Sequence, residues 1–340
     1  MAGAVYDRGY RPYEGERGGR REARAALFRA TARRALGWRR PWRQKVVPFA
    51  LLAIVTVPAI VNVGIAYVSQ DTVGSDIEFF TYRDYVGVSN ALLVFVALTA
   101  PDIMCPDRRQ RVLPLIFARP LKGADYVIAK VGAMTAILFA FSFLPQVLLF
   151  VGQMLVSDDG ALTYSRDNAE VLWQVPLAVA LLSLYYAAIG VAISSLTSRR
   201  IIAGALIVGL FLVTSVISEV LVEAEEVTVQ QGSGLPSSVI IEEDGERQVV
   251  IIGEDGQERP IIVDDETGEA FVRQEPTAAP LLNVAALPLL LRDVVFLGQI
   301  EDTHPMGGLD NGGVLAGLVY VFIVGASLTT LFVRYDEVER

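Results

Sequence analysis

Several uninterrupted apolar segments constrain the fold of this chain more than any other feature. A helix of about 20 apolar residues spans the hydrocarbon core of a bilayer, and soluble domains seldom contain such runs. Hydrophobic residues make up 53% of the 340-residue chain. The sequence therefore predicts an all-α polytopic membrane protein with six transmembrane helices, at residues 46–68, 85 to about 104, 126–156, 171–196, 201–222 and 314–333.

Basic residues at the ends of these spans predict how the chain is oriented. Residues 1–45 contain thirteen Arg or Lys and four acids, and further basic residues lie at 101–125, at Arg199 and Arg200, and at Arg334. With six spans, all of these basic residues fall on one side of the membrane, whereas Arg166 is the only basic residue in the loops at 69–82 and 157–170 on the other side. Because basic residues are retained in the cytoplasm, we predict a multi-pass plasma or inner membrane protein with both termini cytoplasmic.

Two N-terminal segments precede the first span. Residues 1–21 are rich in Gly, Arg and Tyr without apolar periodicity, which predicts a disordered basic tail. Residues 22–45 are interpreted as an amphipathic helix, because Ala25, Phe28 and Ala32 recur at helical spacing among arginines. Such a helix suits the surface of an anionic membrane; the alternative is a solvated helix that lies on no surface.

A long loop follows the fifth span and divides into two parts. Residues 223–279 are acidic, and Asp244-Gly245, Asp255-Gly256 and Thr267-Gly268 separate short apolar runs. These hairpin signals predict a small extracytoplasmic β insertion, with a disordered acidic linker as the alternative. Within the C-terminal segment, residues 280–340, the stretch 280–300 is too short to cross a bilayer. It is predicted to form outer re-entrant half-helices broken at Pro288, Arg292 and Asp293, or else a single helix packed on the outer domain.

Composition excludes most catalytic chemistry. One cysteine, Cys105, and one histidine, His304, leave no internal disulfide and no Cys or His cluster for a metal. The sequence lacks a Gly-x-x-x-x-Gly-Lys-Ser/Thr phosphate loop, so this chain does not bind ATP by that route. No ionisable residue lies at the middle of a span, as an ion-coupled carrier would require. We therefore predict no enzymatic activity, cofactor, metal or nucleic acid for this chain.

The segment between the second and third spans combines two properties that rarely occur together. It carries six basic residues between 101 and 130, but also a run of apolar side chains from Val112 to Leu121. A segment of this kind lies against a surface, either lipid headgroups or another protein.

In its order of motifs this segment resembles the permease of type-2 ABC transporters. The motifs are Asp107-Arg108-Arg109, an apolar helix ending in Arg119-Pro120, and a Tyr-x-x-x-Lys entry to the third span. Residues 188–210, with small side chains on both sides of a basic turn, are similar to the family's fourth and fifth spans. The segments at 280–300 and 22–40 are similar to its re-entrant half-helices and its cytoplasmic connecting helix.

The resemblance implies a permease subunit, most simply of an exporter, that pairs with a second permease copy or paralogue. Two cytoplasmic ABC ATPases in separate subunits would bind ATP and Mg²⁺. The resemblance also implies a coupling helix that contacts the ATPase through Asp107, Arg108, Arg109, Leu113, Ile116, Phe117, Arg119 and Pro120. In this interpretation Leu113, Ile116 and Phe117 seat in an ATPase groove, as apolar helix faces do.

The chain departs from the family pattern at two places. Gln110 and Arg111 stand where a Gly-Thr pair is common, and the acidic insertion is unusual. The alternative function is a non-transporting membrane scaffold or sensor whose insertion binds an extracytoplasmic partner.

Overall fold

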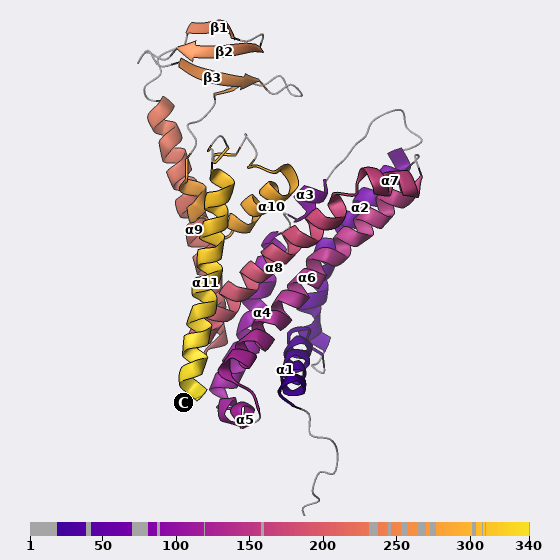
Figure 1. Cartoon of the computed structure of the whole chain (residues 1–340), viewed down its shortest axis with the longest axis vertical. Helices are drawn as coiled ribbons and strands as arrows, with labels where there is room; N and C mark the ends of the chain where they lie inside the picture. Colours follow the sequence, from indigo (N-terminus) through magenta and orange to yellow (C-terminus); the bar gives the residue numbers. More distant parts are fainter. Residues whose placement is uncertain are drawn as a thin grey trace, which may run out of the picture.

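The computed structural model is predominantly helical (Figure 1). It describes residues 19–38, 42–69, 81–86, 89–118, 120–157, 160–230, 237–243, 246–252, 258–263, 270–272, 277–300, 304–307, 309 and 311–339. The α-helices are α1 (Arg20–Ala35), α2 (Trp42–Ser69), α3 (Tyr82–Val86), α4 (Ser89–Arg109), α5 (Leu113–Phe117), α6 (Gly123–Val156), α7 (Ala161–Asp167), α8 (Val171–Leu196), α9 (Arg200–Gln230), α10 (Leu287–Leu297) and α11 (Gly312–Glu339).

Four helices of the described part are long and apolar enough to cross a membrane. They comprise Gly123–Val156, Val171–Leu196, Arg200–Val222 and Gly312–Asp336, and a shorter apolar stretch, Leu52–Ile65, lies within α2. At 1.5 Å per residue, the 34 residues of α6 extend about 51 Å, so this helix exceeds the bilayer core and must tilt. The long apolar helices indicate a membrane-embedded protein, and the count of six spans remains a prediction.

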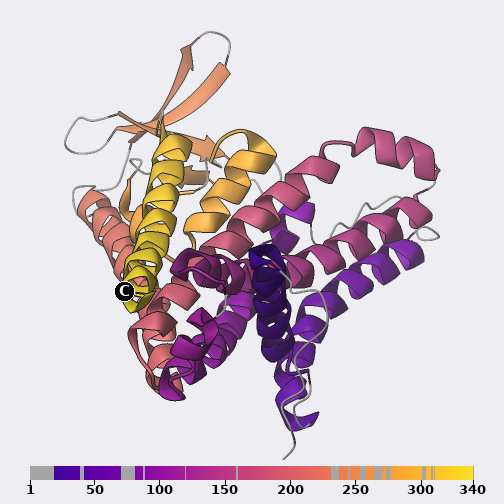
Figure 2. The ribbon, with the colours of Figure 1, turned by 60° about the horizontal axis from the view of Figure 1, so that its bottom comes forward.

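The core of the bundle lies where α8 crosses α4, α6 and α11 (Figures 1 and 2). Helix α8 is the most enclosed of the four candidate spans, with 72% of its apolar window buried. Its side chains Tyr185 and Tyr186 are fully buried, as is Phe95 of α4. Helices α9 and α11 expose most of their apolar side chains, which is the pattern expected of helices that face lipid.

Gly190 of α8 lies at the closest approach to α4. A Cβ atom at this position would lie 2.3 Å from Cγ1 of Val96 and 3.3 Å from Cβ of Ala100. The small residue thus allows two membrane helices to pack closely, as the sequence indicated.

Replacing Gly190 with Ala is expected to destabilise the protein by about 1–3 kcal/mol, because the added methyl group overpacks the contact with Val96. Gly209 of α9 is the matched control, since a Cβ there meets nothing within 4 Å. Gly209→Ala should therefore leave the melting temperature unchanged or raise it. Thermal unfolding of both variants in detergent measures the difference, and equal melting temperatures would contradict the close contact.

Four strands lie in the acidic insertion: β1 (Ser237–Glu243), β2 (Glu246–Ile252), β3 (Glu258–Val263) and β4 (Ala270–Val272). They form an antiparallel meander in the order β1-β2-β3-β4, in which Val239 pairs with Val250 and Val249 pairs with Ile261. The three predicted turn dipeptides fall in the gaps between consecutive strands, outside the described residues. The sheet follows α9, at the end of the bundle remote from α5 (Figure 1).

In the segment after the insertion, the helical structure is interrupted at a different place from the one predicted. A 3₁₀ turn, η1 (Ala279–Leu282), leads to Asn283, whose Oδ1 accepts hydrogen bonds from the backbone N–H groups of Ala285 and Ala286, and α10 begins at Leu287. Pro288 lies in the first turn of α10, where a missing N–H costs nothing. The expectation that Pro288, Arg292 and Asp293 interrupt the helix was therefore wrong, because all three lie within α10.

Helix α1 lies at the end of the bundle where α4 finishes and α6 begins (Figure 1). Of the predicted tail, only residues 19–21 are described, and the helix already starts at Arg20. Helix α1 packs along α6, with Phe28 close to Gly132. Thr31 and Ala35 on this inner face are buried, whereas Arg29, Arg33 and Trp38 are exposed.

Candidate functional site

Asp107, near the end of α4, connects three helices through its carboxylate. Its Oδ2 accepts hydrogen bonds from Nζ of Lys130, at 2.6 Å, and from the hydroxyl of Tyr126, at 3.0 Å. Its Oδ1 accepts a bond of 2.6 Å from Nη1 of Arg34 in α1. Asp107 is only 2% exposed, so this carboxylate joins α1, α4 and α6 inside the protein.

Lys130 is the counter-charge that makes this arrangement possible. It lies one turn after Tyr126 on the same face of α6, and both side chains are fully buried. Besides Asp107, its ammonium group donates to the carbonyl of Ile103 at 3.0 Å. An ammonium group enclosed in this way is tolerated only when it is paired and hydrogen-bonded. The pair therefore fixes the register between the start of α6 and the end of α4.

The environment of Asp107 keeps its carboxylate charged. Burial acts to raise the pKa of Asp107, but Lys130 and Arg34 outweigh burial through their charges and hydrogen bonds. The pKa therefore lies below its ordinary value of 3.8. A lowered pKa means that the ionised carboxylate contributes stability above pH 3.8, and that this contribution is lost as the pH falls through the folded-state pKa.

The stability difference between the wild type and Asp107→Asn is therefore expected to shrink as the pH falls below 3.8. Protonation turns the wild-type carboxylate into a neutral group comparable to the amide of the variant. Melting temperatures of the two proteins, measured across this range in the same detergent, test the prediction. A difference that stays constant with pH would show that the charge of Asp107 does not contribute.

The last carbonyl groups of α8 are bound by the end of α4. A guanidinium nitrogen of Arg108 donates to the carbonyl of Ser195, and Sγ of Cys105 lies 3.7 Å from the carbonyl of Ser194 and 3.5 Å from that of Thr197. These contacts satisfy carbonyl groups that the helix itself leaves without partners. The only cysteine of the chain is thus a buried packing residue.

The first turn of α9 is tied to the same part of α4, because Arg200 forms an ion pair with Asp102. The turn between α8 and α9 is thus held against α4 from both sides.

The first turn of α6 is held on two sides. Asp125 caps α6 by accepting from the backbone N–H of Lys122 at 3.1 Å, and it pairs with Arg20 of α1 at 2.5 Å. On the opposite side, Gly123 touches α11 so closely that a Cβ would lie 2.7 Å from the carbonyl oxygen of Tyr335. The ring of Tyr335 packs on Tyr126, with centroids 4.8 Å apart. The junction before α6 therefore also contacts the last helix.

Helix α5 has an inner and an outer face. Leu113 is 9% exposed, and Ile116 and Phe117 are half-buried against the core. The ring of Phe117 lies 6.0 Å from that of Tyr126. On the outer face, Leu115 is 71% exposed. The helix thus presents one large apolar side chain to its surroundings while its inner face rests on the Asp107 network.

Arg111 closes α4 in an unfavourable backbone conformation. The N–H of Val112 bonds to the carbonyl of Asp107 and that of Arg111 to the carbonyl of Arg108, which is the Schellman pattern. Arg111 occupies the left-handed position of this motif, with a φ of 53°. Glycine is preferred there because it has no Cβ. The turn between α4 and α5 therefore adopts this geometry with an arginine where glycine is preferred.

The structure places most members of the predicted contact set. Asp107 and Leu113 are buried, and Ile116 and Phe117 are half-buried against the core, with the Phe117 ring next to that of Tyr126. The contact of these side chains with an ATPase stays a prediction. Arg109 and Pro120 are exposed, Arg108 is bound to Ser195, and Arg119 lies outside the described residues.

Three important residues were not assigned from the sequence. Leu115 was not singled out, because its neighbours on both sides are equally apolar. The roles of Lys130 and Arg34 were also missed, although a lysine inside an apolar run is a signal that it needs a buried partner.

A second charged cluster lies at the other end of the bundle. Nε of Arg83 lies 2.9 Å from Oδ1 of Asp293, and Nη2 of Arg292 lies 2.6 Å from the same oxygen. Nη1 of Arg292 also donates to the carbonyl of Arg83, at 3.2 Å. These contacts join α10 to α3, so Arg292 and Asp293 hold the segment in place.

Three or more metal-ligating side chains do not come together anywhere in the part of the chain that the structure describes. A scan of the sequence against protein-family models finds no match, and a search of curated proteins finds none either.

Proposed function

We propose that this chain is the transmembrane permease subunit of an ATP-binding cassette transporter, and that a separate cytoplasmic ATPase docks on α5. The observation that carries the proposal is the geometry of α5. It exposes Leu115 outward, while its inner face packs on a buried network shared by α1, α4, α6 and α11. A short helix with these properties suits the transmission of force between a docked protein and a bundle of helices.

The proposed route of coupling follows these contacts. An ATPase groove holds Leu115, and the exposed Arg109 and Arg111 pair with acids at its rim. Movement of α5 shifts Tyr126 and Asp107, and with them the start of α6 and the end of α4. The contacts of Arg108 with Ser195 and of Arg200 with Asp102 pass this shift on to α8 and α9.

The proposal includes six membrane spans, with α2 and the part of α4 up to about Met104 added to the four long apolar helices, and both termini in the cytoplasm. It also includes a second permease copy or paralogue, export as the direction of transport, and ATP and Mg²⁺ bound only by the partner. The concentration of basic residues at the α5 end supports this orientation.

Purification of the tagged protein from its native membrane in a mild detergent tests the proposal. A subunit with a phosphate-loop motif is expected to accompany it and to hydrolyse ATP. If the protein purifies without any ATPase after several mild detergents and after chemical crosslinking in cells, the permease function is wrong.

A further inference from the structure

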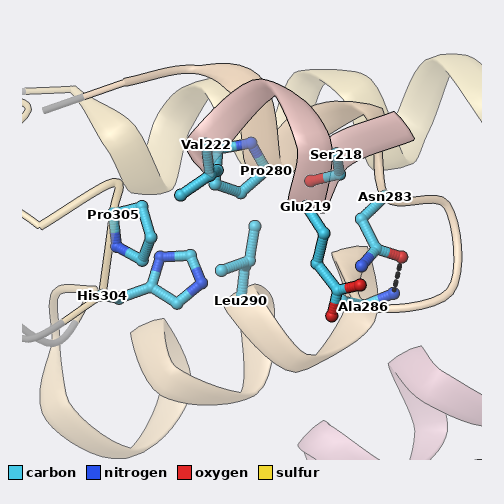
Figure 3. Close-up of a pocket in the computed structure, with 9 residues that line it drawn as sticks. All are labelled: Ser218, Glu219, Val222, Pro280, Asn283, Ala286, Leu290, His304 and Pro305. Carbon is cyan, nitrogen blue, oxygen red and sulfur yellow. Dashed lines mark hydrogen bonds between the residues drawn. The ribbon is translucent and has the colours of Figure 1, made fainter. Parts of the chain in front are cut away.

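A pocket of about 450 Å³ is lined by residues of α9, η1 and α10 and by His304 and Pro305 (Figure 3). Helix α10 and the upper part of α9 lie at the end of the bundle remote from α5 (Figure 1). The walls of the pocket come from α9, from the segment between η1 and α10, and from the turn before α11. Its lining mixes apolar and polar side chains in similar measure. The lining residues that matter here are Glu219, Asn283, His304, Val222, Leu290 and Pro305. The volume of the pocket lies within the range of pockets that bind small organic molecules.

The polar groups of the pocket are held in fixed orientations. Oδ1 of Asn283 accepts hydrogen bonds from Ser215, at 3.0 Å, and from the N–H groups of Ala285 and Ala286, at 3.1 Å each. The amide NH₂ of Asn283 is therefore the end left available to a ligand. Nδ1 of His304 accepts from the N–H of Met306 at 3.1 Å, which fixes the imidazole ring.

Glu219 supplies the charge of the pocket. Its side chain and that of His304 extend into the pocket from opposite walls, with Leu290 between them (Figure 3). Within the described part of the chain, no ion pair engages the carboxylate of Glu219, whereas Asp107, Asp125 and Asp293 are each paired with arginine. A carboxylate at the edge of a pocket selects for a positively charged partner.

The acidic insertion strengthens this preference. Helix α9 continues beyond the pocket to Gln230, and the acids of the insertion lie between Val222, which lines the pocket, and Thr277. Between these two residues the sequence has 15 Asp or Glu and three Arg. A concentration of one sign of charge raises the local concentration of ions of the opposite sign. The charge of the insertion therefore favours cationic over anionic ligands at this end of the bundle.

From these observations we infer that the pocket binds a small organic amine with an apolar body. The ammonium group pairs with Glu219, a hydrogen-bond acceptor of the ligand receives the NH₂ of Asn283, and the apolar part lies against Val222, Leu290 and Pro305. This site does not depend on the α5 surface or on an ATPase partner.

Ligand-observed NMR on the purified full-length protein tests this site, with phenethylamine as the probe and phenethyl alcohol as its neutral counterpart. Phenethylamine is expected to bind saturably, and at least about tenfold more tightly than the alcohol, because hydrogen bonds to charged groups are the stronger ones. The comparison uses the unaltered protein and so does not depend on the folding of a variant. Equal binding of the two probes, or no saturable binding of the amine, would overturn the inference.

Two charge-neutralising variants locate the site. Glu219→Gln is expected to weaken the binding of phenethylamine about tenfold or more without lowering the melting temperature, because the side chain is exposed. Glu170→Gln is the matched control, since it removes an exposed carboxylate that does not line the pocket. Affinity that is unchanged in Glu219→Gln, or lowered equally in both variants, would show that the amine responds only to the general negative charge.

Discussion

Asp107→Leu is expected to lower the free energy of unfolding by about 3–5 kcal/mol, because it leaves the ammonium group of Lys130 buried without a counter-charge. Among the described residues, the carbonyl of Ile103 and the ring of Tyr126, whose centroid lies 5.2 Å from Nζ, would remain as partners of Lys130. Lys130→Met should cost less, about 1–3 kcal/mol, since Asp107 keeps its bonds to Arg34 and Tyr126. Chemical or thermal unfolding in detergent measures both values.

The double variant Asp107→Leu with Lys130→Met distinguishes the contribution of the ion pair to stability from that of side-chain packing. Two apolar side chains can replace a buried ion pair at little cost, so the double variant should be more stable than Asp107→Leu alone. The two substitutions are then strongly non-additive, as expected for groups in direct contact. Additive effects would mean that the charges of Asp107 and Lys130 do not stabilise one another.

Leu115→Asp is expected to reduce the amount of co-purified ATPase at least about tenfold, because a charge replaces the main exposed apolar contact of α5. The fold should be unaffected, since the side chain is 71% exposed. Leu162→Asp is the matched control: Leu162 is 75% exposed and also lies on a short helix, α7, at the other end of α6. A similar loss of ATPase in both variants would contradict a specific role of α5.

The helices were the most predictable part of the fold. Long apolar runs predicted a membrane-embedded helical protein because lipid forces the backbone to bond internally, whatever the neighbours are. Turn signals such as Asp244-Gly245 marked the gaps between the strands, because they depend only on local backbone geometry.

The candidate site was less predictable because it depends on contacts between distant segments. Arg34 and Asp107 are separated by 73 positions, and their pairing follows from the packing of α1, which the sequence alone does not specify. The apolar pattern of α5 also did not reveal which of Leu113, Leu115 and Phe117 faces outward. The sequence did not reveal that the chain turns at Asn283, because an asparagine that caps a turn looks the same in the sequence as one in an ordinary loop. Pro288 was a more conspicuous signal of a helix break.

Photocrosslinking from α5 in living cells tests most directly whether this helix docks on an ATPase. A benzophenone reagent attached to Leu115→Cys, in a Cys105→Ala background, is expected to capture a protein with a phosphate-loop motif. The same reagent at Leu162→Cys should not capture it. Adducts with lipid alone at Leu115→Cys, or capture of the same ATPase from Leu162→Cys, would contradict the docking of an ATPase on α5.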